Sequence, residues 1–181
     1  MRFLCLLLLV SLMGKGQDMS PRIDSVTTNT PNYKRLHQLF GAQSILYAGT
    51  MYGLNVAWYK NKLDNFTFKD DSYEWKQIDK LGHAYTAYQI ARHNAALYKL
   101  TGISDKQAVL YGAIAGVVFQ TPIEILDGFS PDYGFSTGDM VANIVGPGLF
   151  AGQYFLWQET RVYPKFSFHG TSLARVRPEL L

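Results

Sequence analysis

Seven polar side chains of the kinds that carry chemistry lie at helical spacing within otherwise apolar sequence. They are Asp79, Lys80, His83, Glu124, Asp127, Asp139 and Asn143. Asp79 and His83 are four residues apart, as are Asp139 and Asn143, so each pair shares one face of a helix. Because these residues fall at the ends of three separate apolar segments, we expect the helices to direct them into one shared region. We call these seven residues the polar cluster.

Charged groups on apolar helices are costly unless they pair, bind a metal ion or take part in a reaction. One interpretation is a structural network, in which Lys80 pairs with Glu124 or Asp127 and His83 bonds to a carboxylate. A second is an acid–base site with His83, Glu124 and Asp127 as candidate catalytic residues. A third is a metal ion held by His83 with Glu124, Asp127 or Asp139, although one imidazole is few for zinc. The sequence leaves these open; we assign no metal ligand from it and it identifies no cofactor.

Four long helices are predicted to position these residues, over about 36–59, 78–100, 104–125 and 137–157. The first segment carries no Asp, Glu, Lys or Arg and also alternates like a strand, but no turn residue breaks it at strand length. Ser104 with Gln107, and Ser136 with Asp139, have the spacing of capping boxes at helix starts. The predicted fold is therefore an all-α bundle of about four main helices, either embedded in a membrane or lying against one.

Prolines and glycines modify the last two of these helices. Pro122 and Pro147 fall inside them and are expected to kink or interrupt them. Two glycine pairs have the small-xxx-small spacing that lets helices approach closely, in membranes or in soluble bundles. These pairs are Gly112 with Gly116 and Gly148 with Gly152.

The chain begins with the features of a secretory signal peptide. Residues 1–16 contain Arg2, a mostly apolar run from Phe3 to Met13, and small residues up to Gly16. We expect cleavage before Gln17, then a polar lead-in over 17–31 and one helical domain over 32–181. An exported protein of the periplasm or membrane-associated cell envelope is predicted.

The composition limits the classes of partner. Only 17% of residues are charged and 48% are hydrophobic, which suits a protein close to a membrane. The formal charge of +3 falls to +1 without the leader, because Arg2 and Lys15 are its only charged residues, so nucleic acid binding is not expected. The single cysteine, Cys5, also lies in the leader, so the mature chain can form no disulfide. Protein partners are not indicated.

Several strings resemble a known family. They are DKLGHAY at 79–85, EILDGFS at 124–130, YGFSTGDM at 133–140 and KFSFH at 165–169. These strings are similar to the YfiM-like family, described as predicted periplasmic lipoproteins with a domain of unknown function. The resemblance implies an envelope location and no established activity. The DKxxH pattern at 79–83, a later Glu and the DxxxN pattern at 139–143 are also distantly similar to patterns of VanZ-like membrane proteins.

The sequence departs from the YfiM-like pattern at both ends. Cys5 lies near the start of the apolar run, where a lipid-bearing cysteine does not occur, so lipid attachment is not expected. The chain ends at Leu181, whereas the resemblance implies a longer C-terminus, so truncation there is expected.

Overall fold

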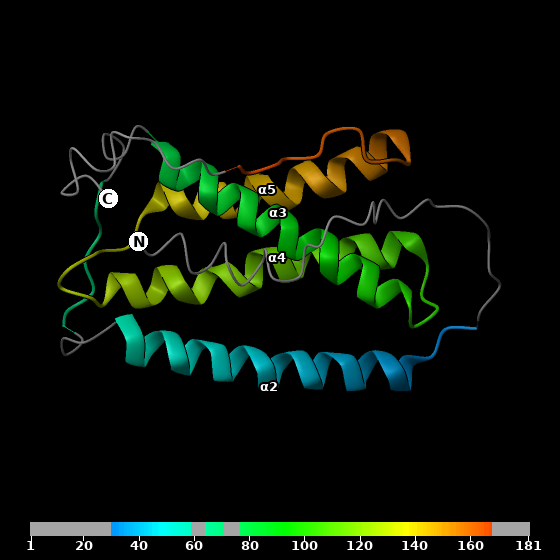
Figure 1. Cartoon of the computed structure of the whole chain (residues 1–181), viewed down its shortest axis with the longest axis horizontal. Coiled ribbons are helices and arrows are strands. Elements are labelled where there is room, and N and C mark those ends of the chain that lie inside the picture. Colours follow the sequence, from blue (N-terminus) through cyan, green and yellow to red (C-terminus); the bar gives the residue numbers. More distant parts are fainter. Residues whose placement is uncertain (1–29, 59–63, 71–76, 168–181) are drawn as a thin grey trace.

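A computed structural model describes residues 30–58, 64–70 and 77–167 (Figure 1). Its elements are four helices, α2 (Tyr33–Trp58), α3 (Ile78–Lys99), α4 (Asp105–Gly128) and α5 (Thr137–Trp157). Within the described residues the only sheet-like pairing is an isolated bridge between Phe68 and Phe135. The predicted all-α bundle is confirmed, as is the choice of helix over strand for the first segment. The leader 1–16, nearly all of the lead-in and the end of the chain lie outside the described residues.

Helix starts follow the capping chemistry read from the sequence. Ser104 accepts a hydrogen bond from the Gln107 backbone N–H at 3.3 Å, and the Gln107 side chain accepts one from the Ser104 N–H at 3.2 Å. At α5, Ser136 accepts from the Asp139 N–H at 3.2 Å, which is one half of the predicted box, while the Ser136 backbone bonds to Glu124. Each cap satisfies backbone donors that the first helical turn leaves without partners. The capping pairs therefore fix where α4 and α5 begin.

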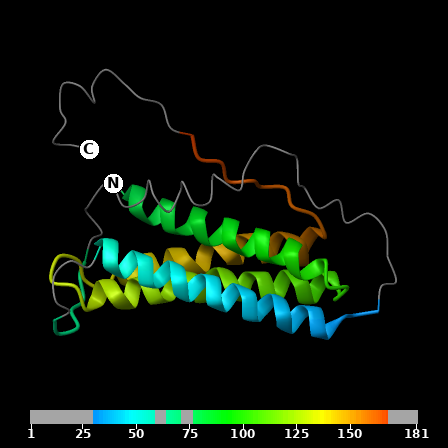
Figure 2. The same cartoon turned by 60° about the horizontal axis from the view of Figure 1, so that its bottom comes forward.

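Three of the helices form the core. Helices α3, α4 and α5 pack against one another, and Tyr88, Ala91, Val109, Phe150 and Tyr154 belong to one buried cluster between them. Figure 2 shows this arrangement in a second view. The first-turn residues of α3 and α5 and the last turn of α4 meet at one end of the bundle, the left end in Figure 1. The polar cluster therefore lies at that end.

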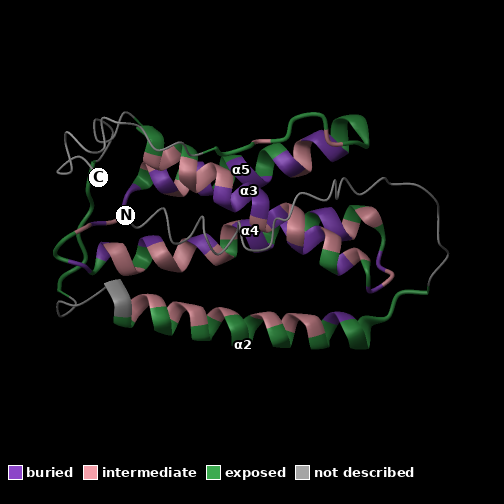
Figure 3. Ribbon diagram, viewed as in Figure 1, coloured by how far each residue is buried: buried purple, intermediate pink, exposed green. Residues whose placement is uncertain are grey.

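Helix α2 runs along the outside of the bundle and is largely exposed (Figure 3). Tyr47 stacks on Phe119 with ring centroids 4.8 Å apart, and its hydroxyl donates to the Phe119 carbonyl at 2.8 Å. Gln43 donates to the Asn94 side chain at 2.6 Å and accepts from the Tyr98 hydroxyl at 2.9 Å. A few specific contacts therefore hold α2 against α3 and α4.

Only one of the two predicted glycine pairs lies at a helix crossing. A Cβ at Gly112 would collide with the Ala91 carbonyl, and one at Gly116 would lie 2.7 Å from the Ala87 carbonyl. A Cβ at Gly148 or Gly152 would meet nothing within 4 Å, so the predicted crossing of that pair is wrong. Spacing alone does not say which face of a helix is turned inward.

The close contact of α5 is made instead by Gly146. A Cβ there would collide with the Ala84 carbonyl of α3 and lie 2.9 Å from the Tyr88 nitrogen. Pro147, beside it, is buried, and α5 continues through it without interruption, as α4 does through Pro122.

The connector over 64–70 closes the end of the bundle where the polar cluster lies. Thr67 N–H donates to the Gly128 carbonyl at 2.8 Å, and Phe135 N–H donates to the Thr67 carbonyl at 2.9 Å. Phe66 packs on Phe129 and Phe135, with ring centroids 5.0 and 5.6 Å away. The aromatic side chains of this segment therefore anchor it to the body of the protein.

Among the described helices, α4 is long and apolar enough to cross a membrane, judged by length and composition. Of its most apolar window, 33% is buried in the structure. A single helix of this kind is weak evidence of insertion, because a core helix in a soluble protein meets the same criterion.

Candidate functional site

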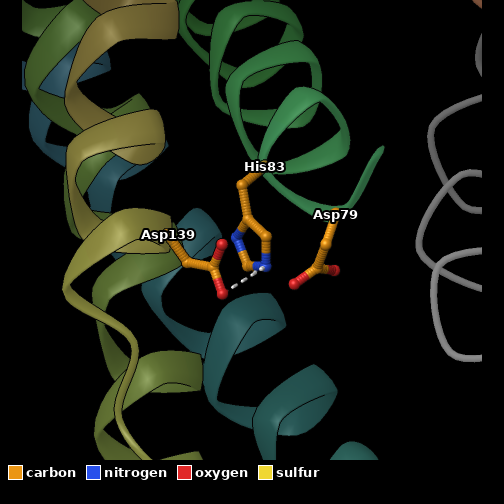
Figure 4. Close-up of side chains that lie close together, drawn as sticks. All are labelled: Asp79, His83 and Asp139. Carbon is orange, nitrogen blue, oxygen red and sulfur yellow. Dashed lines mark ion pairs between the residues drawn. The ribbon is translucent and has the colours of Figure 1, made fainter. Parts of the chain in front are cut away.

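His83 is the centre of the polar cluster. It projects from the second turn of α3, and its side chain is 13% exposed. Its Nδ1 atom lies 3.1 Å from Asn143 Oδ1, and its Nε2 atom lies 3.9 Å from Asp139 Oδ2. An amide oxygen only accepts hydrogen bonds, so the Asn143 contact is a hydrogen bond in those states of the ring that carry a proton on Nδ1. Nε2 faces the carboxylates of Asp79 and Asp139, between which the imidazole lies in Figure 4.

Both of these carboxylates lie at helix N-termini. Asp79 is in the first turn of α3 and Asp139 in the first turn of α5, where the helix dipole stabilises negative charge. Lys80 Nζ lies 3.5 Å from Asp139 Oδ1, and the Lys80 stem passes so close to Gly138 that a Cβ there would collide with it. Both carboxyl groups are thus held beside His83 by the first turns of their helices.

Glu124 is in a different setting, near the C-terminal end of α4. The residue is 1% exposed. The pKa of its carboxyl is raised from 4.5 to about 9, first by burial and then by the negative charges of Asp139, Asp127 and Asp79, in that order of effect. A hydrogen bond from the Ser136 backbone opposes this rise. Glu124 therefore holds a proton at neutral pH in the structure as it stands.

Several buried polar atoms at the cluster have no hydrogen-bond partner. Among them are Glu124 Oε1, Asn143 Nδ2 and Thr86 Oγ1. Glu124 Oε1 lies 3.4 Å from His83 Nδ1, which is within ion-pair distance. This contact is not a hydrogen bond, and the nearer partner of Nδ1 is the Asn143 oxygen. Such groups are rare in native proteins, and an ion or water commonly accounts for them.

The structure brings the predicted residues together. Asp79, Lys80, His83, Glu124, Asp139 and Asn143 meet through the contacts above, and Asp127 acts on Glu124 through its charge. Thr86 lies one turn beyond His83 on α3, as its helical spacing in the sequence indicates. The hydrogen bond from the Ser136 backbone to Glu124 was not predicted, because no sequence pattern indicates it. His93, ten residues beyond His83 on α3, is half-buried, and its ring contacts the Gln89 carbonyl at 2.7 Å.

Three of these residues are placed to hold a metal ion. One ligand atom each from Asp79, His83 and Asp139 lies within 4.8 Å of the others. Two carboxylate oxygens and one imidazole nitrogen form a donor set for borderline divalent metals. The same three groups, with Glu124, could also donate and accept protons.

Comparison with known proteins identifies the family of the chain and no activity. No curated protein and no solved structure matches it significantly. The model of a family described as "Predicted periplasmic lipoprotein (DUF2279)" matches residues 64–155, about half of the chain. This match covers every residue of the polar cluster and agrees with an exported protein of the periplasm or cell envelope. The chain therefore belongs to the DUF2279 family of predicted periplasmic lipoproteins.

Proposed function

We propose that the polar cluster is a working site, at which this envelope protein binds or transforms a lipid-linked or cell-wall substrate. The observation that carries the proposal is the set of buried polar atoms without hydrogen-bond partners, on Glu124, Asn143 and Thr86. A network that served only to hold helices in register would pair such atoms, since each one left unpaired costs about 1–3 kcal/mol. His83 is the residue best placed to act as a base or a ligand.

The alternative is a purely structural network, and stability measurements separate the two. Removing one member of a buried structural network typically costs about 3–5 kcal/mol. A group held in an unfavourable setting for function can be replaced with little loss of stability, or with a gain. The variants His83→Ala and Glu124→Gln distinguish these cases, with His93→Ala as the matched control on the same helix as His83.

The experiment combines melting temperatures with complementation of a deletion strain exposed to detergents and cell-wall antibiotics. We expect both site variants to melt at or above the wild-type temperature and to fail to complement, while His93→Ala complements. Site variants that unfold several kcal/mol more easily than His93→Ala would contradict the proposal and favour the structural network.

We also propose that the protein lies against a lipid bilayer. The outward face of α5 carries large apolar side chains at helical spacing, and α4 exposes others. Those on α5 include Val141, Ile144, Val145, Leu149 and Leu156. A continuous apolar face of this kind is unusual on a monomer in water. Membrane fractionation with carbonate and detergent washes tests this: release by buffer alone would contradict it.

Export through the leader is part of the same proposal. The N-terminus of the mature protein is expected at Gln17, after the small residues Gly14 and Gly16. Sequencing the N-terminus of the envelope-localised protein checks this, and an intact Met1 would refute it.

A further inference from the structure

We propose that Asp79, His83 and Asp139 bind a divalent transition-metal ion. Asp79 and His83 lie one turn apart on α3, and Asp139 faces them from α5 (Figure 4). Their ligand atoms lie within 4.8 Å of one another. This inference rests on the proposed function, in which the cluster is a binding or reaction site, and it names the ligand.

The hydrogen bonding around His83 supports a metal-facing Nε2 atom. Asn143 Oδ1 lies 3.1 Å from Nδ1, where it can accept the Nδ1 proton and orient the ring. Metal-binding histidines commonly use their second nitrogen in this way, since the bond orients the ligand. Glu124 is 1% exposed and sends an oxygen without a hydrogen bond to within 3.4 Å of the same ring. Asn143 and Glu124 therefore lie on the Nδ1 side of the imidazole, and Nε2 faces the two aspartates.

The charges at the site favour a bound cation. The carboxyl groups of Asp79 and Asp139 place ligand oxygens within 4.8 Å of each other and of the His83 ring. Lys80, 3.5 Å from Asp139, supplies one positive charge. Negative charges gathered in a poorly solvated region repel one another strongly, and a bound divalent cation removes that repulsion.

The donor set indicates the class of metal. One imidazole nitrogen and two carboxylate oxygens suit Zn²⁺ or Mn²⁺ better than Ca²⁺, which prefers oxygen ligands alone. A tetrahedral zinc site with bonds of about 2.1 Å places its ligand atoms about 3.4 Å apart. The ligand atoms here lie up to 4.8 Å apart, so binding would require them to approach by up to about 1.4 Å. With three protein ligands, a fourth position would remain for water or substrate.

Zinc titration of the purified full-length mature protein, freed of metal by chelation, tests the site. We expect isothermal titration calorimetry to show one Zn²⁺ per chain. Asp79→Asn, His83→Gln and Asp139→Asn are each expected to weaken binding at least tenfold, since each removes one ligand. His93→Gln is the matched control and is expected to bind within twofold of the wild type. Circular dichroism of every variant confirms that it is folded.

Two outcomes overturn the metal site. One is the lack of saturable Zn²⁺ and Mn²⁺ binding by the folded wild-type protein. The other is weakening by His93→Gln as great as that by His83→Gln, which would place the bound metal elsewhere. Neither outcome decides the proposed function, because that is tested by complementation and melting of His83→Ala and Glu124→Gln. A protein that binds no metal but loses function without losing stability would retain a working site of another kind.

Discussion

Replacing Gly146 by alanine tests the packing that brings α3 and α5 together beside the site. A Cβ at this position would collide with the Ala84 carbonyl and lie 2.9 Å from the Tyr88 nitrogen. Both obstacles are backbone atoms of α3, so no side-chain rotation can relieve the overlap, and the two helices must move apart. The crossing lies next to the site, because Ala84 follows His83 and Gly146 follows Asn143 by one turn.

Two opposing effects set the change in the free energy of unfolding of Gly146→Ala. Overpacking typically destabilises a protein by about 1–3 kcal/mol, and contact with backbone places Gly146→Ala at the upper end. Alanine gains about 1 kcal/mol over glycine in a helix interior, which leaves a net loss of about 2 kcal/mol. For a chain of this size, that lowers the melting temperature by about 4–8 °C. Gly148→Ala is the matched control, since it meets nothing within 4 Å and keeps only the gain in helix propensity.

The melting temperatures of the two variants are measured by circular dichroism, with both proteins in one mild detergent. We expect Gly146→Ala to melt below the wild type and Gly148→Ala to melt at or above it. Equal melting temperatures for the two variants would refute this account of the α3–α5 contact. A destabilised Gly148→Ala would show that the outward face of α5 is packed after all.

Three further outcomes are expected. Ser104→Ala removes the cap of α4 and should lower the unfolding free energy by about 1 kcal/mol in urea denaturation, whereas the exposed neighbour Lys106→Ala should not. In chelator-treated protein, burial keeps Glu124 protonated when folded, with a pKa of about 9, against 4.5 for an unperturbed carboxyl. The folded state therefore binds this proton more tightly than the unfolded state does. Its contribution to the free energy of unfolding is complete below about pH 4.5 and is lost as the pH rises through 9. Between pH 7 and 8 the wild type should lose about 1.4 kcal/mol relative to Glu124→Gln, and parallel pH profiles would contradict the assignment. Gln153→Ala removes the side chain that accepts from Arg161 N–H at 2.9 Å and Val162 N–H at 2.5 Å, so trypsin should cleave after Arg161 faster than in the wild type.

The helices could be predicted because each is set by local rules. Ser104 and Ser136 mark the starts of α4 and α5 through hydrogen bonds within one turn, which depend on residue type and spacing alone. The first segment was resolved as a helix by length, since it lacks a turn residue. By contrast, the packing of α2 depends on pairs such as Tyr47 with Phe119, 72 residues apart, which no local pattern specifies.

The sequence predicts which residues form the site but not how they are arranged. Helical spacing places Asp79 with His83 and Asp139 with Asn143, but it does not say how the two helices face each other. In the structure, His83 Nδ1 faces Asn143 and Nε2 faces Asp139. The contact with Asn143 orients the ring, and Nε2 is the atom proposed to bind the metal ion. The sequence also gives no sign that Glu124 is the most buried of the carboxyls, because its neighbours resemble those of Asp127.

Helical spacing also does not show which glycine of α5 contacts another helix, and that contact affects the geometry of the site. Gly146 and Gly148 are two residues apart on one helix, and only the first meets another backbone. Gly146 lies one turn beyond Asn143, the residue that orients His83, so the close crossing also sets the distance between them. A change that separates the helices should therefore lengthen the 3.1 Å contact between His83 and Asn143 and release the ring. Zinc affinity should then fall in Gly146→Ala and not in Gly148→Ala, although neither residue offers a ligand atom.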